Sequence, residues 1–260
     1  MNCPILQALK VGGIIFLLSF FFSMLLWDFF LRVLTTVSMP LARKFEERRE
    51  PRYADRLFSL ARIYTGMKIQ RNPDLPSRLP PYFLLICNHQ SFVDIAFLIY
   101  CFAGYRLRFV AKESLAHLIP YISPLFRLQR HALVSRRGNV QKTMSELLRL
   151  GKIAPQGYCP VVFPEGTRSK TGELGSFHSG AVRTILTRQP MPVLCAAIDG
   201  GHMVSSLSHL FTNMRKATYK FAALRCFPAP TSKEEINAVL RESRKLIAVK
   251  LRHWRSNRNS

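Results

Sequence analysis

Apolar residues run without a charged side chain from Val11 to Trp27, and the apolar pattern continues after Asp28 to Leu31. About 20 such residues are enough to cross the hydrocarbon core of a bilayer as a helix, or to enter it as a helical hairpin within one leaflet. A cleaved signal peptide fits less well, because only Lys10 supplies a positive charge before the stretch and no small-x-small cleavage site follows it. We therefore predict a transmembrane or membrane-embedded helical segment over residues 1–38.

Charged residues follow in a block from Arg43 to Arg56, where six basic side chains are interleaved with four acidic ones. Basic residues flanking a membrane segment stay on the cytoplasmic side, so the contrast with the single Lys10 places the C-terminal body in the cytoplasm. The block is equally compatible with the solvated face of an amphipathic helix and with direct lipid contact. Both interpretations leave the body on the same side of the membrane.

A proline-rich stretch separates this block from the rest of the chain, with four prolines between Asn72 and Pro81. Proline neither continues a helix nor fits inside a central strand, so the stretch indicates a linker. We therefore expect a basic helix and a Pro-rich linker over residues 39–81, and a globular domain over residues 82–260.

Within the globular domain, apolar runs of four to six residues alternate with segments of helical period. Such alternation is typical of an α/β domain, and we predict a mostly buried mixed sheet flanked by helices. Strands are expected at Tyr82–Ile86, Arg108–Ala111, Ala132–Val134, Cys159–Phe163, Val193–Ile198 and Thr218–Leu224, and helices at Phe92–Tyr100, Asn139–Leu150 and Ser179–Thr187.

The end of the chain carries a helix-start signal. Ser232 and Glu235 have the spacing of a capping box, and an incomplete apolar stripe runs from Ile236 to Trp254 with basic residues on the opposite face. We expect this helix to pack on the domain, with binding to a membrane surface as the alternative.

Charge and cysteine content narrow the classes of partner. The chain has 38 Lys and Arg against 15 Asp and Glu, a net charge of +23, so anionic partners are expected. The apolar N-terminus favours a membrane surface, and the absence of zinc-finger spacing, a basic zipper or an aromatic RNA-binding signature argues against nucleic acid. The six cysteines form no CxxC pair, which indicates small core residues in a reducing compartment and no metal site.

A histidine and an acid lie five residues apart directly after the first apolar run, at His89 and Asp94. On one regular helix they would be about 140° and 7.5 Å apart, too far for a hydrogen bond. If a helix began at Ser91, His89 would remain in the preceding loop and the carboxylate of Asp94 could reach one imidazole nitrogen, leaving the other free to accept a proton. The alternative is that Ser91 and Asp94 form only a helix cap and His89 has no role.

A second candidate segment follows the apolar run that ends at Phe163. It contains Glu165, Gly166, Thr167 and Arg168. Loops at strand ends gather ligands in α/β domains, a guanidinium matches phosphate, and glycine permits close approach of the backbone. A surface turn with an unconnected arginine is the alternative for these four residues. Lys112 adds a second cation at the end of another predicted strand.

Together these segments resemble a known family. Asn88–Asp94 is similar to the NHxxxxD block of the glycerolipid acyltransferases, in particular the 1-acylglycerol-3-phosphate O-acyltransferases. Phe109–Lys112, Phe163–Ser169 and Met191–Ile198 resemble the second, third and fourth blocks, in the same order. The resemblance extends from about residue 82 to residue 198.

The resemblance implies roles for individual residues. His89 would be the general base, Asp94 its orienting partner, and Lys112 an aid in binding phosphate. The phosphate-bearing acceptor would be held by Glu165, Gly166, Thr167 and Arg168, and Arg136 corresponds to a further substrate-binding arginine. Two positions depart from the family pattern: Ser135 stands where an acid is usual, and His178 where a lysine is usual. Both concern the acceptor more than the reaction.

The implied activity is transfer of a fatty acyl chain from a thioester, acyl-CoA or acyl carrier protein, to the free hydroxyl of a lysophospholipid. The expected acceptor is 1-acylglycerol-3-phosphate, which would give phosphatidic acid, and no cofactor or metal is expected. One alternative keeps the reaction and uses another lysolipid, such as a lyso-aminolipid. The other is a non-catalytic basic membrane protein that binds lipid or nucleic acid.

Overall fold

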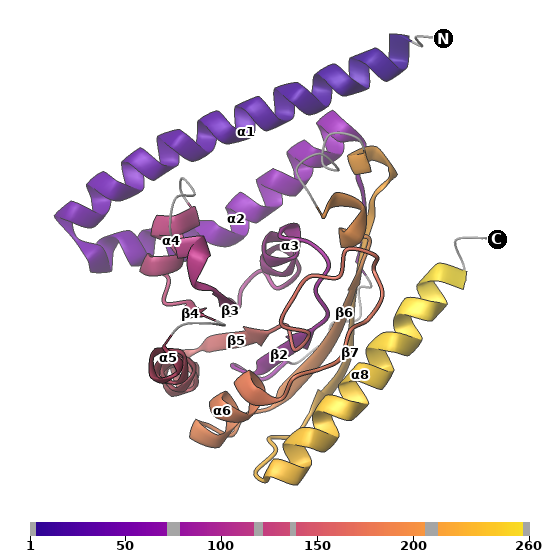
Figure 1. Cartoon of the computed structure of the whole chain (residues 1–260). Coiled ribbons are helices and arrows are strands. Elements are labelled where there is room, and N and C mark those ends of the chain that lie inside the picture. The colour runs from indigo at the N-terminus through magenta and orange to yellow at the C-terminus, as the bar shows by residue number, and fades with distance from the viewer. Residues whose placement is uncertain (1–3, 72–78, 117–121, 136–138, 206–212, 257–260) are drawn as a thin grey trace.

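A mixed seven-stranded sheet organises the chain, with strand order β1-β7-β6-β2-β5-β3-β4 (Figure 1). The computed structural model describes residues 4–71, 79–116, 122–135, 139–205 and 213–256. Strands β6 and β7 are antiparallel, and all other neighbouring pairs are parallel. The strands are β1 (Lys68–Arg71), β2 (Leu84–Cys87), β3 (Arg106–Lys112), β4 (Ala132–Val134), β5 (Tyr158–Val162), β6 (Val193–Asp199) and β7 (Thr218–Phe227).

Helices cover both faces of this sheet. The longer helices are α1 (Pro4–Val37), α2 (Met39–Thr65), α3 (Val93–Cys101), α4 (Ile122–Leu128), α5 (Val140–Ile153), α6 (Gly180–Arg188) and α8 (Lys233–Ser256), and the short 3₁₀ turns are η1 (Glu113–Ala116), η2 (Ala154–Gln156), η3 (Gly201–Val204) and η4 (Met214–Lys216). Apolar side chains of α2 and α3 pack on one face of the sheet. Those of α5, α6 and α8 pack on the other. The predicted α/β fold with a buried mixed sheet and flanking helices is confirmed.

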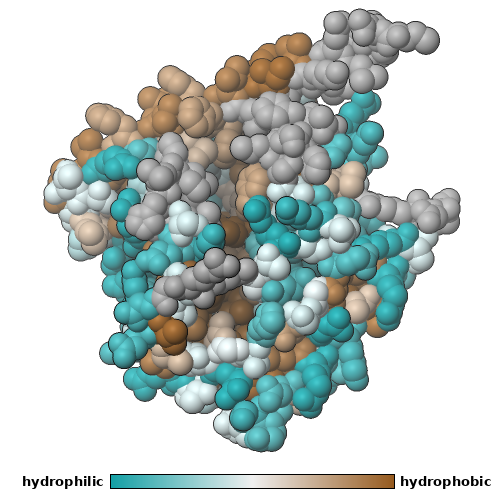
Figure 2. Space-filling model, viewed as in Figure 1, coloured by the Kyte–Doolittle hydropathy of each residue, from teal (hydrophilic) through white to brown (hydrophobic). Residues whose placement is uncertain are grey.

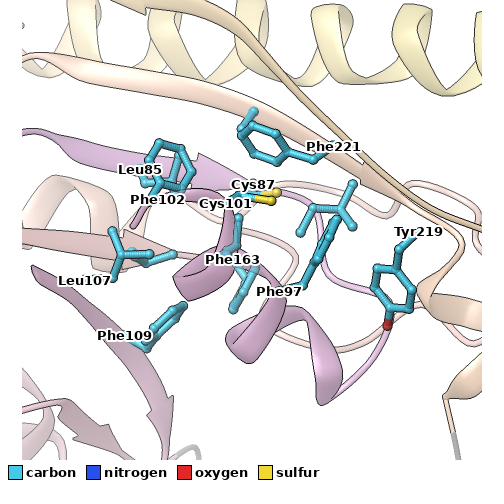
Figure 3. Packing of buried hydrophobic residues seen from close by; sticks show 14 of the residues in the cluster. Leu85, Cys87, Phe97, Cys101, Phe102, Leu107, Phe109, Phe163, Tyr219 and Phe221 are labelled. Carbon is cyan, nitrogen blue, oxygen red and sulfur yellow. The ribbon is translucent and has the colours of Figure 1, made fainter. Parts of the chain in front are cut away.

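Aromatic residues dominate the cluster beneath α3. Figure 3 shows Phe97 of this helix in a cluster whose other members come from several strands and include Phe109, Tyr219 and Phe221. The Phe97 and Tyr219 rings meet edge to face, with centroids 4.8 Å apart. Edge-to-face pairs add about 1 kcal/mol beyond the burial of their area. This packing fixes α3, and with it the loop between β2 and α3, against the sheet.

The central strands are buried on both faces, because helices cover both sides. All five residues of β5 and all seven of β6 are buried. Since β2, β3, β4, β5 and β6 run parallel, their carboxyl ends lie along one edge of the sheet. The loops that carry the candidate residues therefore emerge at the same edge.

Two elements differ from the sequence pattern. Strand β1 lies within the stretch predicted as basic helix and linker, and pairs parallel with β7. Its four residues, KIQR, contain no apolar run, so nothing in the local sequence indicates a strand. Helix α4 was not predicted either, and only seven residues form it.

The C-terminal helix α8 begins as its capping box predicts. The Glu235 backbone N–H donates to Ser232 Oγ at 3.1 Å, and Glu235 Oε2 accepts from the Ser232 N–H at 3.4 Å. Ile236, Ile247 and Leu251 are buried against the sheet. Packing on the domain is therefore confirmed.

The N-terminal helices α1 and α2 lie side by side (Figure 1) and are joined at Ser38, whose Oγ accepts from the Leu41 N–H. In α1, Leu18–Val37 is a candidate membrane span of 20 residues with mean hydropathy 1.6, by length and composition. Its apolar side chains form the brown band along the top of Figure 2. Across the pair, the Arg49 guanidinium lies 3.9 Å from the centre of the Trp27 ring.

The charged block on α2 divides between its two faces, which neither interpretation of the sequence anticipated. The acidic Glu46 is 1% exposed, and the side chains of Glu47 and Glu50 are 15% and 11% exposed. Glu47 accepts from the fully buried Arg108 of β3 at 2.6 Å and from the Tyr158 hydroxyl at 3.0 Å. The acids thus dock α2 onto the sheet, while several basic residues of the block face outward.

Candidate functional site

His89 lies in the loop after β2, and four contacts fix it. Its ring stacks on Phe163 with centroids 4.0 Å apart and an 11° angle between planes. Its backbone N–H donates to Glu165 Oε1 at 2.8 Å, and its carbonyl accepts from the Ser169 N–H at 2.8 Å. The fourth contact joins its Nδ1 to Asp94 Oδ2 at 2.9 Å. Three of these four contacts come from the segment after β5, so the two candidate segments form one site.

Asp94 is fully buried in the first turn of α3, and one of its oxygens accepts three hydrogen bonds. Besides His89 Nδ1, Oδ2 accepts from the backbone N–H groups of Gln90 at 2.6 Å and Ser91 at 2.8 Å. An ionised carboxylate only accepts, so Nδ1 carries the proton and Nε2 is the basic nitrogen. Among the described residues, none forms a hydrogen bond with Nε2. The same carboxylate therefore both caps the helix and orients the imidazole.

Helix α3 begins two residues after Ser91, so the predicted cap is shifted. Phe92 occupies the N-cap position with a helical backbone and no side-chain cap. Ser91 Oγ still accepts from the Val93 N–H at 3.3 Å, and it donates to the Val204 carbonyl at 2.9 Å. The serine stabilises the helix start while the chain before it bends enough to bring His89 back to Asp94.

Tyr219 and Gly201 support Asp94 from behind, and no sequence signal pointed to either. The buried Tyr219 hydroxyl lies 3.4 Å from Asp94 Oδ1. Burial, together with the negative charge of Asp94, raises the pKa of Tyr219 well above its usual range, so it remains a hydroxyl donor. A Cβ on Gly201 would lie 2.7 Å from Asp94 Oδ1 and 3.1 Å from the Tyr219 hydroxyl. Only glycine leaves room there for the carboxylate.

Glu165 joins the loop of His89 to the loop that follows β5. Its Oε1 accepts from the His89 N–H, and its Oε2 accepts from the Gly175 N–H at 2.8 Å. Burial raises the pKa of this carboxyl, opposed by these two backbone donors. Both oxygens are occupied and a carboxylate repels an anion, so the geometry suits positioning of the loops better than the predicted contact with a phosphate.

A polar network connects this loop to the end of α8. Gln90, which is fully buried, donates from Nε2 to Asp199 Oδ1 at 3.2 Å. Arg255 approaches the same oxygen at 3.3 Å and also donates to the Gly172 carbonyl at 2.7 Å. Because these contacts join residues more than fifty positions apart, no local sequence pattern indicates them.

The predicted phosphate-binding residues lie at the same edge of the sheet. Gly166 has φ 64°, a left-handed conformation that favours glycine, and its N–H donates to the Phe163 carbonyl at 3.0 Å. This tight turn leaves Thr167 and Arg168 exposed next to the peptide that contacts His89. Lys112 is exposed at the end of β3, two strands from β2, which corresponds to about 10 Å across the sheet. The arrangement leaves both cations accessible to an anion near His89.

Arg136 lies outside the described residues. His178 is exposed, and its N–H donates to the Pro164 carbonyl at 2.8 Å. Burial raises the pKa of Cys87, directly before Asn88, well above its usual range, so it is a thiol and a poor nucleophile. Among the described residues, no group of three His, Cys, Asp or Glu side chains is placed to hold a metal ion.

The sequence of this chain is similar to proteins of one known family. A model of the acyltransferase family matches residues 71–199. Chloroplastic 1-acyl-sn-glycerol-3-phosphate acyltransferases of Brassica napus and Arabidopsis thaliana are 32% and 31% identical over 56% and 58% of this chain. The matched regions cover only 41% and 42% of those relatives. This chain therefore matches less than half the length of either plant protein.

A solved structure shares the fold over nearly the whole chain. The crystal structure of the 1-acyl-sn-glycerophosphate (LPA) acyltransferase PlsC from Thermotoga maritima superposes with a TM-score of 0.69 and covers 95% of both chains. Its sequence identity is 17%, so this likeness concerns the fold. The match thus includes the sheet and its flanking helices and extends into the N-terminal helices.

Proposed function

The chain belongs to the acyltransferase family through its domain at residues 71–199, and we propose that it transfers a fatty acyl chain from a thioester to the free hydroxyl of a lysophospholipid. The proposed acceptor is 1-acylglycerol-3-phosphate, the substrate in the names of the plant relatives, and the product would be phosphatidic acid. The donor would be acyl-CoA or acyl carrier protein.

The contact of His89 Nδ1 with the buried Asp94 carboxylate carries this proposal. Asp94 holds the proton on Nδ1, and Nε2 can then accept the proton of the acceptor hydroxyl. The oxygen attacks the thioester carbonyl, a C–O bond forms, and the C–S bond breaks as the tetrahedral intermediate collapses. The proton on Nε2 passes to the departing thiolate, and the ester and the free thiol leave. No acyl-enzyme is needed, which agrees with the buried thiol at Cys87.

Arg168 and Lys112 would bind the acceptor phosphate. Arg168 is exposed beside the segment that holds His89, and its planar guanidinium can form two parallel hydrogen bonds with phosphate oxygens. If the phosphate binds at Arg168, the free hydroxyl on the adjacent carbon of the lysolipid would lie near the loop that carries His89. Ser135 and His178 depart from the family pattern. If the acceptor is a different lysolipid, we expect these two residues to select it.

The proposed location is a membrane surface, with the catalytic domain on the cytoplasmic side. The exposed apolar residues of α1 support membrane attachment, and the basic residues after it support the orientation. The lysolipid acceptor resides in the bilayer, so attachment would bring the enzyme to its substrate.

The experiment is an acyl-transfer assay on the full chain in nanodiscs, with a panel of lysolipids and both donor types. His89→Ala should abolish transfer while His253→Ala, an exposed histidine on α8, should leave it unchanged. Thermal unfolding and nanodisc incorporation check that both variants fold. Turnover in His89→Ala comparable to that of the unmodified chain would refute the mechanism, and no turnover with any lysolipid would favour a non-catalytic binding protein.

A further inference from the structure

We propose that the hollow between α4, β4 and α5 binds the phosphate headgroup of an anionic membrane lipid. The hollow has a volume of about 520 Å³. It lies on the outermost strand β4, which is separated from β2 by β5 and β3, so it is remote from His89. Its size is within the range of sites that hold small molecules.

Cationic side chains line this hollow in excess. Arg127, Arg130, Lys142 and Arg149 contribute to the wall, against Glu146 as the acidic residue. Four positive charges and one negative charge leave a net charge of +3 on the lining. An anion entering the hollow would be attracted by all four cations.

Two of these cations have no acidic partner in the part of the chain that the structure describes. Lys142 pairs with Glu113 at 2.5 Å, and Arg149 pairs with Glu146 at 2.6 Å. Within the described ranges, neither Arg127 nor Arg130 forms an ion pair with an acidic side chain. Their guanidinium groups are therefore available for a phosphate, whose geometry they match.

Two basic side chains next to these arginines are affected by their burial and by the cations around them. His131 is buried, and its Nδ1 accepts from the Phe109 N–H at 3.0 Å. Burial, followed by the charges of Arg108 and Arg149, lowers the pKa of His131 well below its usual value. Burial, followed by the charge of Arg130, also lowers the pKa of Arg43.

Arg130 has an unusual backbone conformation. Its φ is 60°, which makes it the one non-glycine residue with positive φ in the part of the chain that the structure describes. A residue with a Cβ is strained there, and retained strain of this kind concentrates at ligand sites. The Arg130 carbonyl is held by two N–H groups of Arg149, both at 3.2 Å. The wall of the hollow is therefore built around this conformation.

The position of α4 identifies the ligand as a lipid. Leu125 and Leu128 of α4 pack with Met24 and Leu31 of α1, the helix with exposed apolar side chains. Figure 1 shows α4 beneath α1 and next to the first part of α2, and α4 contacts both helices. Arg127 thus lies within the segment that contacts the candidate membrane helix, and Arg130 follows two residues after it. Since α1 packs on α2 and α4, it lies along the membrane surface in this proposal, and the charged lipid headgroups come next to this segment, where each basic residue contributes to binding.

A binding experiment tests the proposal with the full chain in neutral detergent. Every protein carries Arg168→Ala, which removes a phosphate contact at the candidate active site. Dihexanoyl phosphatidylglycerol is titrated by calorimetry, with dihexanoyl phosphatidylcholine and inorganic phosphate as comparisons. The test variant is Arg127→Gln with Arg130→Gly, because glycine accepts the left-handed backbone without strain. The matched control is Arg241→Gln with Arg252→Gln on the exposed face of α8.

We expect the test variant to bind phosphatidylglycerol about tenfold more weakly, since two charge-assisted contacts are lost, and the α8 variant to bind as before. Phosphatidylcholine and inorganic phosphate should both bind more weakly than phosphatidylglycerol. Equal binding by test and control variants would overturn the site, and inorganic phosphate binding as tightly as the lipid would overturn the lipid as ligand. If the double variant unfolds at a lower temperature, Arg127→Gln alone is assessed by the same criteria.

Discussion

Glu50 should make the docking of α2 onto the sheet sensitive to pH. Its side chain lies 3.7 Å from Arg108 Nη1, and Glu46 and Glu47 are close by on the same helix. Burial raises the pKa of Glu50 from 4.5 to about 7; Arg108 opposes this, and the two neighbouring carboxylates reinforce it. Arg108, together with Arg106 at 3.8 Å from Glu47, does not compensate three closely spaced carboxylates, so Glu50 favours its protonated form below about pH 7. Replacement by glutamine, which has the same shape and no charge, tests this directly.

The direction in which stability changes with pH follows from the raised pKa of Glu50. A carboxyl whose pKa is raised by folding favours the folded state fully below pH 4.5, and this contribution is lost as the pH rises through 7. The difference between 4.5 and about 7 corresponds to about 3 kcal/mol at about 1.4 kcal/mol per pH unit. Glu50→Gln keeps the neutral form at every pH. It should therefore match the unmodified chain at pH 4.5 and be more stable at pH 8.5.

Thermal unfolding of the full chain in detergent, scanned from pH 4.5 to 8.5, measures this difference. At about 2–4 °C per kcal/mol for a chain of this size, the variant should unfold about 6–12 °C higher at pH 8.5. Asp55→Asn is the matched control, since Asp55 is an exposed acid on the same helix, and it should show no such gain. A pH-independent difference, or a Glu50→Gln protein that is less stable at pH 8.5, would refute this reasoning.

Three further variants concern the candidate active site. Asp94→Asn should lower kcat by about 100-fold or more through loss of the oriented imidazole; a loss of about 1 kcal/mol in stability with normal kcat would leave only the helix cap. Tyr219→Phe removes the donor to Asp94 Oδ1 and keeps the ring packing, so kcat should fall about fivefold with KM unchanged, and an unaltered pH–rate profile and kcat would contradict a positioning role. Arg168→Ala should raise the KM of the acceptor far more than that of the acyl donor, and equal changes in both would argue against phosphate binding.

Local patterns predicted the parts of the fold that depend on neighbouring residues. The apolar runs predicted β2, β5 and β6 because those strands are buried on both faces. The contact of His89 with Asp94 could be expected from spacing, since a helix start between them is a local event. The four-residue β1 could not, because it is a strand only through its parallel pairing with β7, about 150 positions later.

The same limit applies to the candidate site. Tyr219 lies 125 positions after Asp94, and Gly201 is required only because two other side chains fill the space beside it. Glu165 was recognised by its motif, yet its position shows both oxygens on backbone N–H groups, a function that a motif cannot distinguish from ligand binding. A motif contains residues that contact a ligand and residues that position them. The sequence alone does not separate the two kinds.

The charged residues of α2 explain how α1 and α2 can be attached to the domain while the apolar surface of α1 stays exposed. Both interpretations of the sequence placed the whole charged block outside, whereas Glu46, Glu47 and Glu50 turn inward around Arg108. Burying acids against the sheet removes negative charge from the surface, so the exposed side of α2 is more basic than its composition indicates. Ionic and aromatic contacts hold α2 to the domain. The helix α1 packs on α2 and α4, and it therefore need not bury all its apolar side chains, many of which are exposed. A protein of this construction can keep its apolar helix available to a bilayer while the buried glutamates hold the sheet, and the candidate site at its edge, in a fixed position relative to that helix.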